Sequence, residues 1–447
     1  MNLRGFLRER GDTLDVPRSV DPRFELPAVV VQDESRPIRF GSVEGYPDVT
    51  AVANLLSTRE LVGSALGVEA SQIIDRMRAA MDRPESLSDP VEPTFDHVER
   101  NPTIDEHVPV PVFYEEHERR YFASSIVIAR DPETGVHNLS FHRLQYDGGN
   151  ELVMRLVERH LHDIYSRTDG PLDVAVVMGV HPAVELAAAT SISPDASELE
   201  LANALMDGDL RVTEVDGITV PADAEVVWKA RILEETREEG PFVDLSRTWD
   251  VVREQPVMEV TDLYLREDPL VRVIVPARSE HAHLMGVPQE PRIFRIVANT
   301  VPTVRNVVLT PGGCSWLHGV VQLEKRSAGD PKNAGLAALA GHPSMKKVTV
   351  VDTDIDPADP DAVEWATATR MQPDRDIETI EGAKGSSLDP SQDLERGVLT
   401  KWLVDATIPH DRDPSDFREV TVPGADDLDL ETYLDADAPD RGRGGDR

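Results

Sequence analysis

The middle of the chain, from about residue 105 to residue 295, is dominated by short apolar runs that end in turn residues. The runs "SSIVIAR", "DVAVVMGV", "RVTEVDGITV" and "LVRVIVP" have the length and the β-branched composition of strands. Two helical patterns interrupt them, "NELVMRLVERHLHDIYSR" and "SELELANALM". A chain that gathers so many strands in one block must build a sheet-based domain there.

The two ends of the chain mix helices with strands. Before residue 95, "TRELVGSALGV" and "ASQIIDRMRAAM" predict helices and "LPAVVVQ" predicts a short strand. After residue 296, the runs "NVVLT", "GVVQLE", "NAGLAALAG", "KVTVVDTD" and "DAVEWATATRM" alternate between strand and helix, which predicts an α/β layer with partly parallel strands. We expect an α/β domain at 1–100, a strand-rich domain at 101–295, an α/β domain at 296–430 and a disordered acidic tail at 431–447.

Charge narrows the classes of partner. The chain has 82 acidic against 46 basic residues and a formal net charge of −36. A field this negative repels phosphate backbones and argues against binding to nucleic acid or to anionic membranes. An acidic surface with few lysines fits a protein that works at high salt, where charge repulsion is screened.

The hydropathy of the chain and the absence of several motifs exclude further classes of protein. No stretch approaches the ~18–20 apolar residues of a membrane-spanning helix, and the N-terminus predicts an amphipathic helix rather than a signal peptide, so we expect a cytoplasmic protein. The phosphate loop G-x-x-x-x-G-K-[ST], the zinc motif H-E-x-x-H and the elbow G-x-S-x-G are absent from the sequence. The single cysteine, Cys314, excludes intramolecular disulfides and multi-cysteine metal sites.

Three polar clusters are candidates for chemistry. In "HNLSFHRLQ", alternation along an extended segment places Asn138, Ser140 and His142 on one face. In "RHLHD", at the C-terminal end of a predicted helix from about residue 150, His160 is a metal-ligand candidate. The third cluster is a set of carboxylates, which includes one in "SELELA" and two in "EEGPFVD". Each cluster also has a structural interpretation, namely a strand with one wet face, a histidine favoured by the helix dipole and an acidic surface, and the residue patterns alone leave both interpretations open.

Taken together and in order, these clusters resemble the UbiD family of decarboxylases, which use prenylated FMN. The resemblance spans most of the chain. It rests on the segments "NLSFHRLQ", "VVMGVHPAVELAAAT", "SELELANAL", "VPADAEVVWKA", "EEGPFVD", "KKVTVVDTDID", "AVEWATATRMQPDRD", "SSLDPS" and "LVDATIP". The chain departs from the family pattern at Val243, where a small residue is usual, and at "EVVWKA", which lacks the second glutamate and the glycine of the family's segment.

The resemblance implies a full set of site residues. Asn138, His160 and Glu198 fall where the family binds a divalent metal, usually manganese, that holds the flavin phosphate, and potassium is a further candidate ion. Arg143, Glu239 and Asp244 fall on its catalytic arginine and two acids. Ser140, Phe141, His142, Arg143 and Arg159 fall where the family contacts the flavin, as does Lys346 near the phosphate, with adjacent Lys347 leaving the register open.

This chemistry needs these residue types. Loss of CO₂ from an sp² carbon leaves a carbanion that no side chain stabilises, so a cofactor must serve as electron sink. The protein must then return a proton, and burial beside Pro241 and Phe242 would favour an uncharged, protonated carboxyl. We assign Glu239 as the leading proton donor with Asp244 as its partner, and the reverse assignment stays open.

The resemblance also implies a fold, partners and a substrate class. We expect an α+β protein with a central split β-barrel like that of flavin reductases, flanked by α/β domains, in a homodimer or homohexamer supplied with cofactor by a flavin prenyltransferase. For an archaeal, salt-adapted member we favour decarboxylation of trans-anhydromevalonate 5-phosphate to isopentenyl phosphate in isoprenoid synthesis. The alternatives are an aromatic acid such as a polyprenylated 4-hydroxybenzoate in quinone synthesis, and a flavin-binding protein without turnover.

Overall fold

The computed structural model describes residues 1–116, 118–393, 395–420, 422–424 and 428. The chain divides into a compact unit, Met1–Thr407, and a second unit, Ile408–Arg447. The described part of the second unit contains one short 3-10 helix, η4 (Pro414–Phe417). The predicted tail at 431–447 lies outside the described residues.

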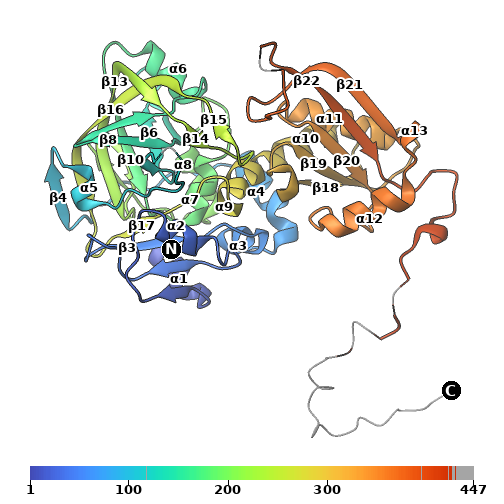
Figure 1. The fold of residues 1–447 in the computed structure, drawn as a ribbon, viewed down its shortest axis with the longest axis horizontal. Helices are drawn as coiled ribbons and strands as arrows, with labels where there is room; N and C mark the ends of the chain where they lie inside the picture. Colours follow the sequence, from blue (N-terminus) through green and yellow to red (C-terminus); the bar gives the residue numbers. More distant parts are fainter. Residues whose placement is uncertain (117, 394, 421, 425–427, 429–447) are drawn as a thin grey trace, which may run out of the picture. The chain divides into compact units, whose positions relative to one another are not determined.

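The first unit contains a nine-stranded antiparallel sheet (Figure 1). Its strands, in spatial order, are β5 (Tyr121–Phe122), β8 (Leu144–Gly148), β9 (Glu151–Met154), β16 (Arg253–Leu265), β13 (Val226–Glu239), β10 (Leu172–Met178), β6 (Ile126–Arg130) and β7 (His137–Phe141), with β4 (His97–Arg100) also pairing β16. Two hairpins accompany the sheet: β11 (Val212–Val215) with β12 (Ile218–Pro221), and β14 (Phe242–Val243) with β15 (Trp249–Asp250). This strand-rich block confirms the α+β class. The pairings among the described residues leave the sheet open between β5 and β7, so the split barrel stays a prediction.

The predicted helix from residue 150 is wrong in its first half. Residues Glu151–Met154 form β9, which pairs with both β8 and β16. Gly148 and Gly149 both have positive φ, 111° and 58°, and make the turn between β8 and β9. Pairing on two sides overrides the helical spacing, and the helix α6 (His160–Arg167) begins only at residue 160.

The N-terminal sheet combines strands from distant parts of the chain. Its order is β1 (Leu14–Val16), β2 (Ile38–Phe40), β3 (Thr50–Ala53) and β17 (Leu270–Arg272). The predicted strand in "LPAVVVQ" is wrong, because these residues form the helix α2 (Glu25–Val30). Leu26 and Val30, four residues apart, are buried on one helix face, and Pro27 sits in the first turn, where no N–H is needed.

The C-terminal α/β layer forms as predicted. Its sheet runs β18 (Val304–Leu309), β19 (His318–Leu323), β20 (Lys347–Val351), β22 (Val398–Asp405) and β21 (Ile377–Lys384). The pairs β19–β20 and β20–β22 are parallel, whereas the two edge pairs are antiparallel, which confirms the partly parallel order.

Helices cover these sheets (Figure 1). They are α1 (Leu3–Arg10), α3 (Arg59–Ala65), η1 (Ala70–Gln72), α4 (Ile73–Asp82), α5 (Ile104–His107), α7 (Pro182–Ala188), α8 (Glu198–Leu205), α9 (Ser279–Gly286), η2 (Val287–Gln289), α10 (Glu290–Thr300), η3 (Pro311–Gly313), α11 (Asp330–Gly341), α12 (Pro360–Arg370) and α13 (Pro373–Asp376). The amphipathic N-terminal helix and the helix at "SELELANALM" are confirmed as α1 and α8.

A buried cluster of charged side chains connects the N-terminal sheet to the helices beside it. Arg272 of β17 is fully buried, and its guanidinium donates to Glu185 of α7 and Glu280 of α9 at 2.5–3.1 Å. Glu280 also accepts the main-chain N–H groups of Asn54 and Leu56. Because every charge has several partners, the desolvation cost of the cluster is offset, and removal of one partner would leave a buried charge unpaired.

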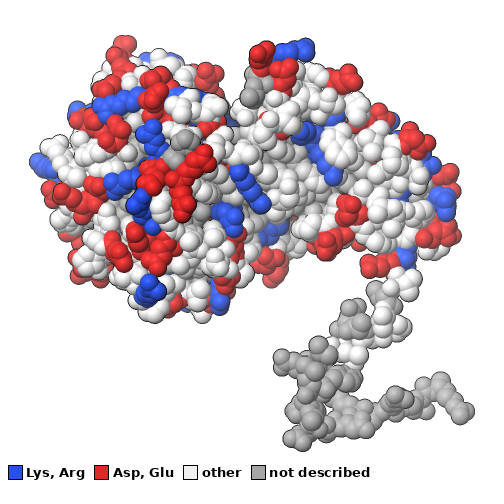
Figure 2. Space-filling view, viewed as in Figure 1, with Lys and Arg blue, Asp and Glu red and all other residues white. Residues whose placement is uncertain are grey.

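Charge on the surface is mixed. On the face shown in Figure 2, acidic and basic side chains are interspersed. Among the described residues, no helix is both long enough and apolar enough to cross a membrane.

Candidate active site

A cavity of about 820 Å³ brings together segments that lie far apart in the sequence. Its walls include β7, the segment between β9 and α6, the loop before α8, the β14–β15 hairpin, α9 and residues 384–388. This volume lies within the range of ligand-binding sites, roughly 300–1,000 Å³.

Strand β7 lines one wall with alternate polar side chains. Asn138, Ser140 and His142 line the cavity, but Leu139, Phe141 and Arg143 line it as well, so the lining does not separate the two faces that the alternation predicts. The His142 Nδ1 lies 2.9 Å from the main-chain oxygen of Arg155 and its Nε2 lies 2.9 Å from Ser140 Oγ. A carbonyl only accepts, so Nδ1 carries the proton and Nε2 accepts from the hydroxyl. Burial lowers the pKa of His142 to about 4, which keeps the ring neutral.

Glu198 meets β7 at the end of the cavity that suits a cation. Its carboxylate accepts the main-chain N–H of Leu139 at 2.9 Å and the Asn138 amide at 3.3 Å. Burial raises the pKa of Glu198 to about 7 by disfavouring its charged form, and no Lys, Arg or His of the described residues lies in an ion pair with it to supply a positive charge. A divalent cation beside Glu198 and the Asn138 oxygen would supply that missing charge, so the donor set fits an oxygen-seeking metal.

His160 lines the same cavity from the start of α6. The prediction that placed it at a helix C-terminus is wrong, because the helix begins at this residue. Imidazole nitrogens are common metal ligands, so the position of His160 in the cavity wall keeps it a candidate ligand. Among the described residues no three His, Cys, Asp or Glu side chains gather closely enough to hold a metal by themselves, so a metal held here would need an amide oxygen and ligands from outside the chain.

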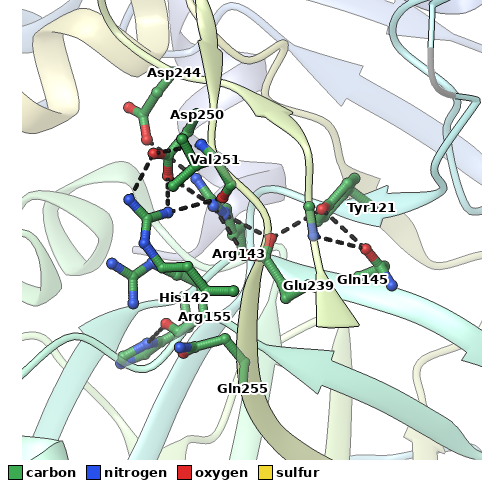
Figure 3. Close-up of polar contacts among 12 residues, drawn as sticks. Tyr121, His142, Arg143, Gln145, Arg155, Glu239, Asp244, Asp250, Val251 and Gln255 are labelled. Carbon is green, nitrogen blue, oxygen red and sulfur yellow. Dashed lines mark hydrogen bonds and ion pairs between the residues drawn. The ribbon is translucent and has the colours of Figure 1, made fainter. Parts of the chain in front are cut away.

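Arg143 is the centre of a carboxylate network (Figure 3). Its Nε and Nη2 donate to the two oxygens of Glu239 at 2.8 and 2.9 Å. Nη1 donates to Asp244 at 3.1 Å and Nη2 to Asp250 at 3.0 Å. Burial alone would lower the pKa of Arg143, but the hydrogen bonds and charges of the three carboxylates outweigh burial and raise it. The guanidinium also lies over the Phe242 ring, 4.4 Å from its centroid.

The two acids of "EEGPFVD" have different surroundings. Glu239 is fully buried at the end of β13 and accepts a further hydrogen bond from Tyr121 at 2.9 Å. Asp244 keeps 17% of its side chain exposed and lines the cavity, whereas Glu239 does not. The turn between them, Gly240–Pro241, has a cis peptide bond and a φ of 103° at Gly240, and the two carboxylates that flank it contact different nitrogens of one guanidinium.

Sequence reasoning missed several further polar side chains in the cavity. Arg155, Asp250, Arg253 and His281 are among them. Asp250 accepts hydrogen bonds from both Nη groups of Arg253, at 2.7 and 2.8 Å. Because Asp250 also accepts a hydrogen bond from Arg143, it links the two guanidinium groups. The available signal for Asp250 and Arg253 was their position in the turn-rich segment directly after "EEGPFVD".

The predicted flavin contacts Ser140, Phe141, His142, Arg143 and Arg159 all line the cavity. Lys346 is not among its lining residues, because its ammonium pairs with Asp389 at 2.9 Å. Lys384 lines the cavity instead. Lys347 lies over the Trp402 ring. The structure therefore does not decide which of the two lysines corresponds to the predicted contact near the flavin phosphate.

The fold and this cavity define an α+β enzyme whose site joins a metal-suited end to an arginine–carboxylate network. Three consecutive family models match the chain, namely the N-terminal domain of 3-octaprenyl-4-hydroxybenzoate carboxy-lyase at residues 4–81, its Rift-related domain at 86–279 and its C-terminal domain at 282–406. The chain belongs to the UbiD family of carboxy-lyases.

Individual relatives are similar over nearly the whole chain. The anhydromevalonate phosphate decarboxylase of Methanocaldococcus jannaschii is 43% identical over 90% of this chain and 96% of its own length, and that of Methanothermobacter thermautotrophicus is 41% identical over 91% and 97%. Among solved structures, the UbiD-class enzyme HmfF from Pelotomaculum thermopropionicum in complex with FMN has a TM-score of 0.93 and 36% identity, and covers 97% of this chain and 100% of its own. An evolved dimeric form of HmfF in complex with prFMN has a TM-score of 0.88 and 34% identity.

Proposed function

We propose that this protein is a prenylated-FMN-dependent decarboxylase that converts trans-anhydromevalonate 5-phosphate to isopentenyl phosphate. The observation that carries the proposal is the intact network of Arg143 with Glu239 and Asp244, of which Arg143 and Asp244 line the cavity. The substrate rests on relatives of that name that are 41–43% identical over nine-tenths of the chain. We retain the proposals of a cytoplasmic, salt-adapted, archaeal protein, of a homodimer or homohexamer, and of a flavin prenyltransferase that supplies the cofactor.

Residues for the cofactor and metal follow from the cavity wall. Ser140, Phe141, His142, Arg143 and Arg159 would contact the flavin, and Asn138, His160 and Glu198 would hold manganese beside its phosphate. Potassium and the contact from Lys346 remain part of the proposal, with Lys384 as a second candidate for the lysine. When bound, the prenylated flavin supplies the electron sink that decarboxylation at an sp² carbon requires.

The chain's own task is to hold the acid and to return a proton. Glu239 fixes the orientation of Arg143 and is itself held by Tyr121, and the flat guanidinium of Arg143 lies over Phe242. Asp244 lines the cavity, which supports its carboxyl as the group that returns a proton to the reacting carbon. The contacts therefore favour Asp244 as donor and Glu239 as its partner, the reverse of our leading assignment from sequence.

A substrate panel tests the proposal. The protein is produced together with a flavin prenyltransferase, and CO₂ release is measured with trans-anhydromevalonate 5-phosphate, its dephosphorylated acid and 4-hydroxybenzoate. We expect turnover to be fastest with the phosphorylated acid and to be lost in Arg143→Ala, with Arg237→Ala as a matched control outside the cavity. Preference for 4-hydroxybenzoate would overturn the substrate, and no release by flavin-loaded protein from any of the three would favour a flavin-binding protein without turnover.

A further inference from the structure

The hydroxyl of Tyr121 lies between two side-chain oxygen atoms (Figure 3). Its oxygen is 2.9 Å from Glu239 Oε1 and 3.1 Å from Gln145 Oε1. All three side chains are buried, and none of them is among the residues that line the cavity. A phenol carries one proton, so it can donate fully to only one of these two oxygens at a time. The second contact is a hydrogen bond only if Glu239 brings a proton of its own.

Two main-chain groups fix the orientation of the Gln145 amide. Its Oε1 accepts the N–H of Gly240 at 3.1 Å, and its Nε2 donates to the main-chain oxygen of Glu238 at 3.2 Å. A flipped amide would set its NH₂ group against the N–H of Gly240 and its oxygen against a carbonyl oxygen. The Gln145 atom that faces Tyr121 is therefore an acceptor, and it cannot supply the missing proton.

The Tyr121 side chain is held in place and keeps its proton. Its ring packs edge-on against the ring of Phe242, with the two centroids 4.8 Å apart. Burial and the negative charge of Glu239 raise the pKa of Tyr121 above its usual range. The positive charges of Arg143 and Arg119 oppose this shift but do not outweigh it. The hydroxyl therefore stays protonated, and only the direction in which its O–H bond points can change.

These contacts allow two complete arrangements of the same atoms. With Glu239 ionised, the Tyr121 hydroxyl donates to Glu239 Oε1, and Gln145 Oε1 is satisfied by the N–H of Gly240. With Glu239 protonated at Oε1, that carboxyl donates to Tyr121, and the Tyr121 hydroxyl turns to donate to Gln145. Arg143 donates to the same carboxyl group in both arrangements, because each oxygen keeps a lone pair for it. Both charge states of Glu239 thus fit the structure without movement of a side chain.

The proton of Glu239 is coupled to that of Asp244, because both acids bind the guanidinium of Arg143. When Asp244 gives up a proton, a further negative charge appears beside Arg143, and this charge favours proton uptake by Glu239. Burial lowers the pKa of His281, which faces Asp244, so this ring is neutral and does not take up that proton. The other charged side chains that face these groups are Asp250, Arg155 and Arg119.

We propose that Tyr121 and Gln145 are positioning residues that let Glu239 bind and release a proton without moving. The inference rests on the proposed function, in which Asp244 returns a proton to the product and Glu239 is its partner. Each turnover consumes one proton, which comes from solvent. While Glu239 holds a proton, Tyr121 donates to Gln145, and after Glu239 has released it, Tyr121 donates to Glu239. Neither Tyr121 nor Gln145 gains or loses a proton.

Infrared spectroscopy of the flavin-loaded, full-length protein tests the proposal, because a protonated carboxyl has a C=O band that a carboxylate lacks. The band of Glu239 is isolated by subtraction of the spectrum of Glu239→Gln, or of Glu239→Asp if the first variant does not fold. It is followed against pH over the range in which thermal melts show folded protein. The variants are Gln145→Met, Tyr121→Phe and the double variant, with Tyr165→Phe and Gln322→Met as controls. Both control side chains donate to main-chain oxygens and do not line the cavity.

Each variant has a distinct expected result. In Gln145→Met the midpoint of the Glu239 band should move about one pH unit lower, because only the protonated arrangement loses an acceptor. The alkaline limb of kcat should move to lower pH with it. In Tyr121→Phe the band should move to higher frequency, because the carboxyl O–H has lost its acceptor. Addition of Gln145→Met to Tyr121→Phe should change nothing further, because Gln145 acts only through the hydroxyl. The controls should match the wild type.

Contrary results are equally distinct. The inference is overturned by an unchanged midpoint in Gln145→Met, by an unchanged band frequency in Tyr121→Phe, by additive effects in the double variant, or by the absence of a Glu239 band at every pH. An alkaline limb of kcat that stays in place while the midpoint moves overturns the link to proton return. The infrared results need no turnover, so a wild-type protein without decarboxylase activity would refute the proposed function while the band still decides the roles of Tyr121 and Gln145. If Gln145→Met does not fold, Gln145→Leu is measured in the same way.

Discussion

Arg143 donates two parallel hydrogen bonds, of 2.8 and 2.9 Å, to the carboxylate of Glu239, and the Glu239 side chain is completely buried. The same guanidinium holds Asp244 by a single hydrogen bond of 3.1 Å. The two acids of one short motif are thus unequal, since one is fixed by geometry and the other is left accessible to the cavity.

This inequality predicts different outcomes for the two isosteric variants. Asp244→Asn should lower kcat about 10²- to 10⁴-fold, the usual contribution of a positioned acid, with little loss of melting temperature. Glu239→Gln should lower both turnover and stability, because it leaves the buried Arg143 partly unpaired. Steady-state kinetics and thermal melts of the flavin-loaded variants measure both effects. Full turnover in Asp244→Asn would refute Asp244 as the donor.

Removal of the buried carboxylate at the metal-suited end should weaken metal binding. Glu198→Gln keeps the shape of the side chain but lacks the charge that a divalent cation requires, so manganese affinity should fall at least about tenfold. Metal content after dialysis and titration calorimetry give the affinity. Glu200→Gln is the matched control on the same helix, because Glu200 does not line the cavity. Equal manganese binding by Glu198→Gln and the control would contradict the assigned ligand.

Buried histidines predict a loss of stability as the pH falls. Burial lowers the pKa to about 4 for His142, His181, His283 and His342, and to about 3 for His318. The unfolded chain therefore binds more protons than the folded chain below about pH 6.5, and stability falls as the pH drops from about 6.5 toward 4. At pH 5.5 each such histidine should cost roughly 1 kcal/mol relative to pH 7.5.

His181→Asn separates this effect from general acid sensitivity. His181 caps α7 by accepting the N–H of Ala183, and asparagine is an equally good cap without a titrating ring. Unfolding by denaturant at pH 7.5 and pH 5.5 should show a smaller pH-dependent loss in the variant. A loss equal to that of the wild type would show that the ring of His181 titrates normally in the folded protein.

The C-terminal layer has a position where only glycine fits. A Cβ built on Gly335 of α11 would lie 2.1 Å from Leu403 Cδ1 of β22. Gly335→Ala should therefore destabilise the fold by about 1–3 kcal/mol through overpacking, despite the better helix propensity of alanine. Gly312→Ala is the control, because no atom lies within 4 Å of its added Cβ. A melting temperature of Gly335→Ala equal to that of the control would contradict the close packing.

The local sequence pattern correctly predicted those helices and strands whose apolar residues follow a clear helical spacing or alternation. The strands β18, β19 and β20 and the helices α8, α11 and α12 formed where alternation or helical spacing indicated. The failures, α2 and β9, arise where tertiary pairing or a buried helix face overrides an ambiguous apolar run.

The candidate site shows the same division. Residues in family motifs, such as Asn138 and Arg143, were placed in the cavity by resemblance. Asp250 and the pair formed by Tyr121 and Gln145 could not be predicted, because their importance depends on which side chains lie near them in space.

The alternation of β7 has a consequence for how the gene can vary. Asn138 and Ser140 lie two residues apart in a strand paired with β6 from Arg130 to Ile126, and His142 follows that strand directly. A single-residue deletion within the strand would exchange the two faces of the residues that follow, and would so displace Ser140 and His142 from their hydrogen-bonded positions in the cavity wall. Insertions and deletions should thus be tolerated in the preceding turn, residues 131–136, yet be lethal to activity a few positions later, even where the folded protein accumulates normally.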